Sequence, residues 1–302
     1  MYNRIAIIGA NGYIARNLLY YINNHSPEIV IDSYDIAEEQ VDGYDNYKSV
    51  NLLDANLEGE INYEVDIMFM FAGKTGTEVS FSKYDEFLDC NERALLNVLA
   101  GYVNAKSTAK IVFPSTRLVY KGSNYPIAED GENEYRTVYA INKFACENYL
   151  KIFNNMYGVK YVVFRICVPY GSLVDNATSY GTAEFMIKAA KEKKNITIYG
   201  DGSNRRTLTY IGDLCNILFN ASICEEIKNT VYNIGGEDYS IKEMAEEIAF
   251  MYNASVSQIE FPPQALIIES GSTVFDDTKL RKAINIEYNM RLKDWCKREI
   301  KK

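Results

Sequence analysis

Short runs of apolar residues alternate with longer amphipathic segments through the first half of this chain. Each run has the length of a buried strand, and the amphipathic segments repeat their apolar positions with the period of a helix. The pattern predicts strands near residues 4–8, 29–34, 47–51, 66–72, 110–115 and 160–166, and helices near 12–24, 83–106 and 137–157. Strands and helices that alternate in this way are typical of a parallel, doubly wound α/β sheet.

Beyond residue 167 the pattern becomes mixed. It predicts a helix near 183–193, strands near 196–200 and 231–234, and helices near 240–252 and 277–285. No internal repeat, low-complexity segment or flexible linker separates the two halves. We therefore expect a smaller, mixed C-terminal part that packs tightly on the parallel sheet.

The first predicted strand enters a turn that carries two glycines, and a helix follows. Gly9 permits a tight turn after the strand, and Gly12 lets the backbone come close to a ligand. Ala15 stands where the packing of a helix against a strand needs a small side chain. Because the N-terminus of the helix faces the turn, this segment predicts a cradle for the pyrophosphate of a dinucleotide and hence a Rossmann domain.

An acidic residue that binds the cofactor ribose is expected about 20 residues after such a turn. The second predicted strand offers Asp32 and Asp35. Asp35 is favoured because it ends the apolar run, where a carboxylate reaches past the edge of the sheet, but Asp32 remains an alternative. A carboxylate here binds the ribose 2′-hydroxyl and repels a 2′-phosphate, so NAD is favoured over NADP.

Charge and composition exclude several classes of partner. The 302 residues include 32 Lys and Arg and 41 Asp and Glu, which gives a net charge of -9. This balance argues against nucleic acid or an anionic membrane as a partner. No apolar run has the length of a membrane span, and the first strand begins too close to Met1 for a signal peptide. The six cysteines form no Cys-x-x-Cys pair, which is typical of reduced thiols in the cytoplasm.

The chain contains one histidine, His25, near the predicted end of the first helix. A Ser-His-Asp triad and a zinc site with several histidines are therefore excluded, and we expect no metal. Acid–base chemistry must rest on Tyr, Lys, Asp, Glu or Cys.

Tyr139 and Lys143 lie one turn apart on the same face of a predicted helix. A lysine in this position stabilises the phenolate and makes the tyrosine a usable general base. The same spacing occurs at Tyr44/Lys48 and Tyr102/Lys106, so the motif alone is weak. Only Tyr139/Lys143 follows a strand that ends in hydroxyls, Ser115-Thr116, at the edge where open α/β sheets bind ligands. A surface Tyr–Lys pair is the plainer alternative.

These motifs together resemble the extended short-chain dehydrogenase/reductase family, in particular its nucleotide-sugar epimerases, dehydratases and 4-keto reductases. The resemblance runs nearly from end to end, and the order and spacing of the motifs make it specific. It rests on Gly9 to Ala15, Asn51-Leu52, Phe71 to Gly73, Ser115 to Tyr120, Tyr139 with Lys143, Arg165 to Gly171, Ile198 to Arg206, Tyr210 to Asp213 and Tyr232 to Gly235.

The resemblance implies a set of functional residues. The cofactor-binding residues would be Gly9, Asn11, Gly12, Tyr13, Ile14, Asp35, Asn51, Leu52, Phe71, Ala72, Gly73, Lys74, Ser115, Tyr139 and Lys143. For Lys74 and the adjoining loop 75–77, contact with a phosphate and a merely solvated loop both remain open. Thr116 and Tyr139 would contact the substrate, and Arg206 would hold its diphosphate or nucleotide ribose.

The resemblance also implies a mechanism. Tyr139 would remove a proton from a sugar hydroxyl at C4 while hydride passes to the nicotinamide. Thr116 would hydrogen-bond the developing carbonyl, and Lys143 would bind the nicotinamide ribose and keep Tyr139 acidic. An epimerase rotates the keto-sugar before hydride returns, whereas a reductase uses hydride once.

Three departures from the family pattern are informative. Dehydratases carry Asp-Glu after the catalytic threonine, but this chain has Arg117-Leu118, so we expect no dehydration. Val168 replaces an asparagine usual in the motif at 165–171. The segment 268–272 lacks the arginine that relatives carry near the last helices, which removes a second clamp on the pyrophosphate.

We therefore expect an NAD-dependent nucleotide-sugar epimerase in the cytoplasm that forms a transient 4-keto sugar. The alternative is a nucleotide 4-keto-6-deoxysugar reductase that uses NADH or NADPH, and a non-catalytic cofactor-sensing scaffold is a third hypothesis. The dinucleotide-binding domain would span 1–167 plus roughly 205–236, and the nucleotide-sugar-binding domain roughly 168–204 plus 237–302. Helices 83–106 and 137–157 would form a homodimer interface by analogy with the family.

Overall fold

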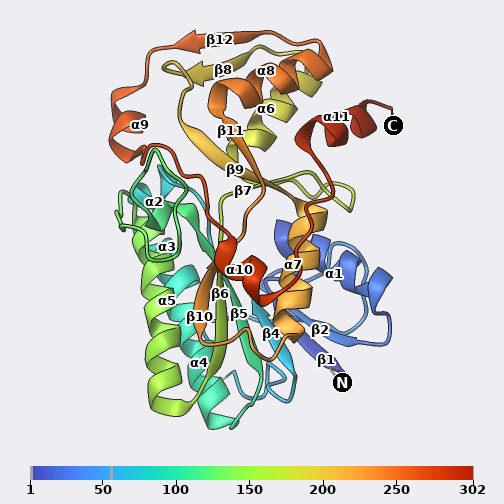
Figure 1. Cartoon of the computed structure of the whole chain (residues 1–302). Helices are drawn as coiled ribbons and strands as arrows, with labels where there is room; N and C mark the ends of the chain where they lie inside the picture. The colour runs from blue at the N-terminus through green and yellow to red at the C-terminus, as the bar shows by residue number, and fades with distance from the viewer. Residues whose placement is uncertain (1–2, 55–56, 302) are drawn as a thin grey trace.

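Seven parallel strands form the central sheet of the protein (Figure 1). The computed structural model describes residues 3–54 and 57–301. The strands lie in the order β10-β6-β5-β4-β1-β2-β3. They are β1 (Arg4–Ile8), β2 (Val30–Asp35), β3 (Tyr47–Ser49), β4 (Ile67–Met70), β5 (Lys110–Thr116), β6 (Lys160–Ile166) and β10 (Thr230–Asn233). The predicted Rossmann-type α/β sheet is confirmed, and the strand order reverses between β1 and β4.

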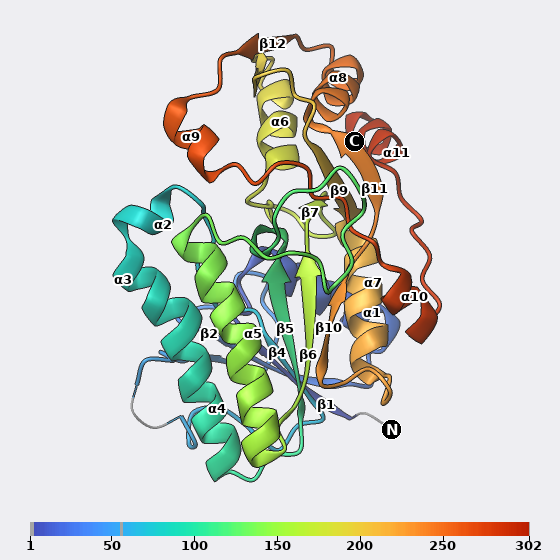
Figure 2. The same cartoon turned by 60° about the vertical axis from the view of Figure 1, so that its left-hand side comes forward.

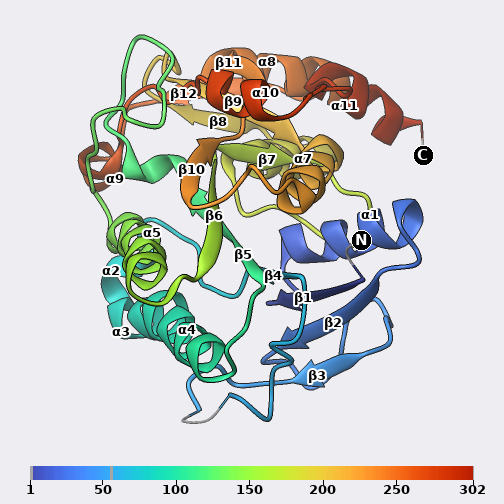
Figure 3. The same ribbon diagram turned by 60° about the horizontal axis from the view of Figure 1, so that its bottom comes forward.

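Helices cover both faces of this sheet (Figure 3). One face carries α1 (Tyr13–His25) and α7 (Ile211–Ile223), and the other carries α4 (Ala94–Asn104) and α5 (Val138–Tyr157). Side chains of one strand alternate between the two layers, so Ile5 and Ile7 of β1 join the first core, and Ala6 and Ile8 join the second. Burial on both faces explains why these strands are continuously apolar.

The ends of α5 follow from its local sequence. Thr137 accepts a hydrogen bond from the backbone N–H of Ala140 at the N-terminus. Gly158 ends the helix in the left-handed conformation with φ of 73°. The helix therefore begins and ends close to its predicted bounds, 137–157.

The predicted helix 83–106 is interrupted. Its range holds α3 (Tyr84–Phe87), a π-helical segment (Leu88–Arg93) and α4, and a further short helix, α2 (Val79–Ser82), precedes it. The wider π turn leaves the carbonyl of Asn91 to accept a hydrogen bond from Cys146 Sγ of α5 at 3.2 Å. The Asn91 side chain meanwhile binds the backbone of Lys74, beyond β4. Such turns recur at functional sites, and here the turn serves a long-range contact that helical periodicity does not predict.

A smaller part lies beyond the carboxyl ends of the central strands (Figure 2). A three-stranded sheet has the order β11-β9-β7, and a two-stranded sheet pairs β12 with β8. The strands are β7 (Val168–Tyr170), β8 (Ile196–Tyr199), β9 (Arg205–Tyr210), β11 (Glu237–Ser240) and β12 (Val256–Ile259). The helices of this part are α6 (Thr182–Lys191), α8 (Ile241–Tyr252), α9 (Pro263–Ile268) and α11 (Leu292–Ile300), whereas α10 (Thr278–Ala283) contacts β10 of the central sheet. A 3₁₀ turn, Arg117–Val119, follows β5.

The two parts share one core. Ile5 of β1, Leu214 of α7, Leu208 of β9 and Trp295 of α11 belong to the same buried cluster. The division into 1–167 plus 205–236 and 168–204 plus 237–302 stays a prediction. Within it, β9, which we assigned to the dinucleotide-binding part, pairs with β7 and β11 of the small sheet. None of the helices in the described part of the chain is long and apolar enough to cross a membrane.

Candidate active site

The glycine turn after β1 lies against the end of β4. Gly9 has φ of 86°, and a Cβ on it would lie only 2.4 Å from the Ala72 backbone nitrogen. The backbone nitrogens of Phe71 and Ala72 both donate to the Ile8 carbonyl at 2.8 Å, which fixes this close approach. Gly12 caps α1 with its backbone in an extended conformation. Glycine is thus required at position 9 for two independent reasons, conformation and space.

A cavity of about 280 Å³ opens at this edge of the sheet. It contains the ends of β1, β2 and β4, where the strand order reverses. Nine predicted cofactor residues line it: Gly9, Gly12, Asp35, Asn51, Leu52, Phe71, Ala72, Gly73 and Lys74. Because the glycine turn lies against the backbone of β4 and an acidic side chain lines the cavity at the end of β2, these residues fit a dinucleotide.

The two acidic candidates on β2 have different surroundings. Asp35 lines the cavity, and its carboxylate accepts hydrogen bonds from the backbone nitrogens of Asn11 at 3.0 Å and Ala37 at 3.3 Å. Asp32 instead accepts from the Asn62 side chain at 2.9 Å and lies 3.5 Å from Arg4 Nε. Asp32 does not line the cavity, so the geometry favours Asp35 as the ribose ligand.

Six predicted cofactor residues lie outside the cavity lining, and three of them belong to the glycine turn and the start of α1. The Asn11 side chain binds the backbone of Glu39 and Val41 and so shapes the loop after β2. Tyr13 donates to the carbonyl of Gly171 at 2.7 Å and ties α1 to the segment after β7. Ile14 packs against the core beside α1. Their side chains therefore make contacts around the cavity and do not line it.

Lys74 is held from two sides. Asn91 Oδ1 accepts from its backbone nitrogen at 3.0 Å, and Asn91 Nδ2 donates to its carbonyl at 3.2 Å. The Lys74 ammonium pairs with the exposed carboxylate of Glu86. Asn91 is a residue that the sequence reasoning missed, and it fixes the backbone of the loop after β4.

The proposed acid–base residues meet at the end of β5. Tyr139 and Lys143 are buried on the same face of α5, and the Thr116 hydroxyl hydrogen-bonds Tyr139. Lys143 Nζ donates to the carbonyl of Pro114 at 3.0 Å and lies 4.5 Å from the centre of the Phe113 ring. A Cβ on Gly73 would lie 3.9 Å from Lys143 Nζ, so this lysine borders the cofactor cavity.

Burial shifts the pKa values of both α5 residues. Desolvation raises the pKa of Tyr139 to about 12, although the Thr116 hydrogen bond acts in the opposite direction. Desolvation lowers the pKa of Lys143 to about 8. In the protein without ligands, Tyr139 is therefore a neutral phenol, and the Lys143 ammonium loses its proton more easily than an exposed lysine does. For Tyr139 to ionise near neutral pH, bound ligands must lower its pKa.

Ser115 points away from the cofactor cavity. Its hydroxyl donates to the buried carboxylate of Glu147 on α5. Arg165 of β6 binds the same carboxylate through Nε at 3.0 Å and Nη2 at 2.6 Å, and its guanidinium lies 4.6 Å from the centre of the Tyr120 ring. This buried ion pair joins α5 to β5 and β6 behind Thr116 and Lys143, and sequence periodicity gave no sign of it.

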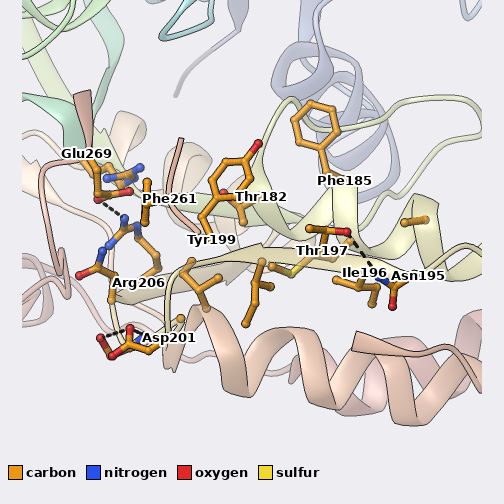
Figure 4. A pocket seen from close by; sticks show the side chains of 18 residues that line it. Thr182, Phe185, Asn195, Ile196, Thr197, Tyr199, Asp201, Arg206, Phe261 and Glu269 are labelled. Carbon is orange, nitrogen blue, oxygen red and sulfur yellow. Dashed lines mark hydrogen bonds and ion pairs between the residues drawn. The ribbon is translucent and has the colours of Figure 1, made fainter. Parts of the chain in front are cut away.

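A second cavity, of about 450 Å³, lies in the smaller part (Figure 4). Arg206 of β9 lines it and is only 2 % exposed. Arg206 Nη2 binds Glu269 at 2.6 Å, and Nη1 binds the carbonyl of Gly271 at 2.6 Å. Thr182, at the N-terminus of α6, lines the same cavity, and so do aromatic side chains, namely Phe185, Tyr199 and Phe261.

Arg117 also lines this second cavity, although we had assigned it no role. It directly follows Thr116, so the acid–base residues lie between the two cavities. The segment after α9, which lacks the arginine expected at 268–272, supplies the carboxylate of Glu269 instead. Contacts between segments so distant in the chain leave no local sequence signal.

Comparison with known proteins shows what this chain is similar to. The sequence profile of the "NAD dependent epimerase/dehydratase family" matches residues 5–235. A UDP-N-acetyl-alpha-D-glucosaminuronate decarboxylase from Bacillus cytotoxicus is 26% identical, over 87% of this chain and 84% of the relative. A UDP-glucose 4-epimerase from Mycoplasma pneumoniae is 25% identical, over 94% and 92%. The UDP-glucose 4-epimerase of Thermus thermophilus, solved in complex with NAD, superposes with a TM-score of 0.84 at 20% identity, over 97% and 96%.

Proposed function

The chain belongs to the NAD dependent epimerase/dehydratase family, and we propose that it is a nucleotide-sugar epimerase that acts through a transient 4-keto sugar. One observation carries this proposal. Thr116, Tyr139 and Lys143 converge at the end of β5, between a cavity that fits a dinucleotide and a cavity lined by Arg206. A sugar that reaches from the second cavity to Tyr139 has its reacting carbon beside the first.

NAD, when bound, supplies a reversible hydride acceptor. We assign its pyrophosphate to the turn at Gly9 and Gly12, where the N-terminus of α1 favours an anion. Asp35 would bind the adenosine ribose and disfavour a 2′-phosphate. Among the described residues that line this cavity the basic side chain is Lys74, whose charge Glu86 already pairs.

Tyr139 would take the proton from the sugar C4 hydroxyl and later return it. Its pKa of about 12 in the isolated protein is too high for an efficient base at neutral pH, so its environment must change when ligands bind. Lys143 would hold the nicotinamide ribose, and its ammonium would then stabilise the phenolate. Thr116 would donate to O4 as the carbonyl forms and keep the sugar within reach of Tyr139.

The second cavity suits a nucleoside diphosphate. Arg206 provides a buried guanidinium, and the N-terminus of α6 provides unpaired backbone N–H groups at Thr182. Tyr199 and Phe261, whose rings lie 5.4 Å apart, offer apolar faces for a base. We assign the diphosphate to Arg206, whose present partner, Glu269, must then share or release it.

Dehydration is the family activity that this site supports least. Elimination needs an extra acid–base pair after the catalytic threonine, and Arg117 and Leu118 supply none.

Replacement of Tyr139 by Phe tests the proposal. The variant removes only the hydroxyl and should retain bound cofactor while it loses C4 epimerisation and the transient absorbance of reduced cofactor. Tyr125→Phe is a matched control, because Tyr125 is exposed and lines neither cavity. Epimerisation by the Tyr139 variant at the rate of the control would refute the assignment of the base.

We also propose that the protein is a homodimer, as the resemblance implied. Apolar side chains remain exposed along α5, namely Ile141, Ile152, Met156 and Tyr157. A helix pair from a second copy would cover them. Light scattering should give twice the monomer mass, and a monomer at micromolar concentration would refute this proposal.

A further inference from the structure

Arg117 is a cation with weak partners inside the second cavity. Its Nη1 lies 3.3 Å from Ser270 Oγ and 3.4 Å from Thr273 Oγ1, which are long for hydrogen bonds. Within residues 3–54 and 57–301, no ion pair joins Arg117 to a carboxylate. The nearest acidic group, Glu269, is bound to Arg206.

Within the part of the chain that the structure describes, Arg117 has no counter-ion of its own in this cavity. Two described carboxylates line it, but Glu269 pairs with Arg206, and Asp201 accepts hydrogen bonds from the backbone nitrogen and hydroxyl of Ser203. Desolvation, together with the charge of Arg206, lowers the pKa of Arg117 to about 10, so the guanidinium still carries its charge at neutral pH. A partly buried cation without a counter-ion favours an anionic ligand.

The position of Arg117 along the chain indicates which part of the ligand it meets. Thr116, the preceding residue, hydrogen-bonds Tyr139, where the proposed mechanism places C4 of the sugar. The diphosphate, at the other end of the substrate, is already provided for by Arg206 and the N-terminus of α6. The backbone of Arg117 adjoins Thr116, and its guanidinium lies near that of Arg206, so Arg117 lies between the C4 end and the diphosphate end of the substrate. The sugar and the substituent on the carbon next to C4 would occupy this place.

We propose that Arg117 binds a carboxylate at C6 of the sugar, so that the substrate is a nucleotide-diphosphate uronic acid. This inference rests on the proposed function, because it uses the placement of C4 at Thr116 and Tyr139. Guanidinium and carboxylate are matched in geometry, and a planar, two-point contact would also orient the sugar ring.

Titrations with UDP-glucuronate, UDP-glucose and UDP test the inference. The wild-type protein, loaded with NAD, should bind UDP-glucuronate roughly 10- to 100-fold more tightly than UDP-glucose, the range for a hydrogen-bonded charge. Arg117→Met should abolish this preference and leave the affinity for UDP unchanged, and Arg117→Lys should keep part of it.

Arg136→Met is the matched control. Arg136 binds the carbonyls of Ile267 and Glu269, so it holds the same segment as Arg117 but does not line the cavity. Its variant should keep the preference for the uronate. If both variants lost the preference for UDP-glucuronate equally, Arg117 would only hold the segment that carries Ser270 in place.

Two further outcomes would overturn the inference. If Arg117→Met lowers the affinity for UDP as much as the affinity for UDP-glucuronate, Arg117 binds the diphosphate. If the wild-type protein binds UDP-glucuronate no better than UDP-glucose, or binds neither, no carboxylate site for such a sugar exists. The proposed function fails separately, if Tyr139→Phe keeps full turnover or no nucleotide sugar reduces bound NAD.

Discussion

Substitution of Gly9 by Ala should destabilise the protein more than the same substitution at a glycine in an ordinary turn. The added Cβ would lie 2.4 Å from the nitrogen and 2.7 Å from the Cα of Ala72, and both are backbone atoms at the end of β4. Real Cβ atoms do not approach backbone so closely, and no side chain can rotate away to make room. Either the turn or the end of β4 must shift.

Two terms add to the cost. A positive φ in a residue with a side chain costs about 1–2 kcal/mol, and an overpacked contact costs about 1–3 kcal/mol more. We therefore expect a loss of roughly 2–5 kcal/mol in the free energy of unfolding. Gly43→Ala isolates the first term, because Gly43 has φ of 72° but no atom within 4 Å of the added Cβ. The control should lose only about 1–2 kcal/mol.

Urea unfolding of both variants measures this difference, and calorimetric titration with NAD measures the effect on the cradle. The Gly9 variant should lose NAD binding, because Phe71, Ala72 and the turn itself line the cavity. Equal unfolding free energies for the two variants, with NAD binding intact in both, would refute the close approach that we describe.

Three other substitutions probe the site. Asp35→Asn should weaken NAD binding by about 1.5–3 kcal/mol and reduce the preference for NAD over NADP, and calorimetric titration measures both. Asp32→Asn should change neither quantity. If only the Asp32 variant lost affinity, Asp32 would be the ribose ligand. Glu147→Gln should lower the free energy of unfolding by roughly 3–5 kcal/mol, because it leaves the buried guanidinium of Arg165 unpaired, and an unchanged urea midpoint would show that the pair is dispensable. The pKa of Lys143 lies at about 8 in the folded protein, against an ordinary value of 10.5, so the unfolded chain binds more protons between these values. The stability of the ligand-free wild-type protein relative to Lys143→Met should therefore rise as pH increases across that window, and a flat difference would contradict the burial of this ammonium.

The central sheet was predictable because its strands are buried on both faces. Continuous apolar runs separated by amphipathic helices admit few other arrangements. The bounds of α5 agree with the predicted range 137–157 to within a residue. The cofactor residues followed from the same topology. Gly9, Asp35 and Phe71 end or follow neighbouring strands, so they meet at one edge whatever the details of packing.

The elements that we missed lack local boundaries. Strand β9 passes into α7 at Tyr210 and Ile211 without a glycine or proline between them, so its periodicity is hidden. The π turn at Asn91 depends on Cys146 and Lys74, which lie far away in the sequence. Strands β7, β11 and β12 are too short to give a clear alternation.

The polar contacts of the second cavity could not be predicted from the sequence for a related reason. Arg206 appeared as a candidate through its motif, but its partner Glu269 lies on a segment where we noted only a missing arginine. Arg117 appeared only as a departure from the dehydratase pattern. Its placement beside Arg206 depends on how Ser270 and Thr273 are brought back to β5 and β9, and that is a property of the folded chain.

The most direct test of the central claim is mass spectrometry of the nucleotide that leaves the freshly purified protein on acid denaturation. An epimerase returns each hydride to its substrate and needs no exchange of cofactor between turnovers. We therefore predict NAD or NADH in near-stoichiometric amount. An empty protein, or one that releases NADP, would contradict internal recycling and the role of Asp35, and would favour a 4-keto reductase.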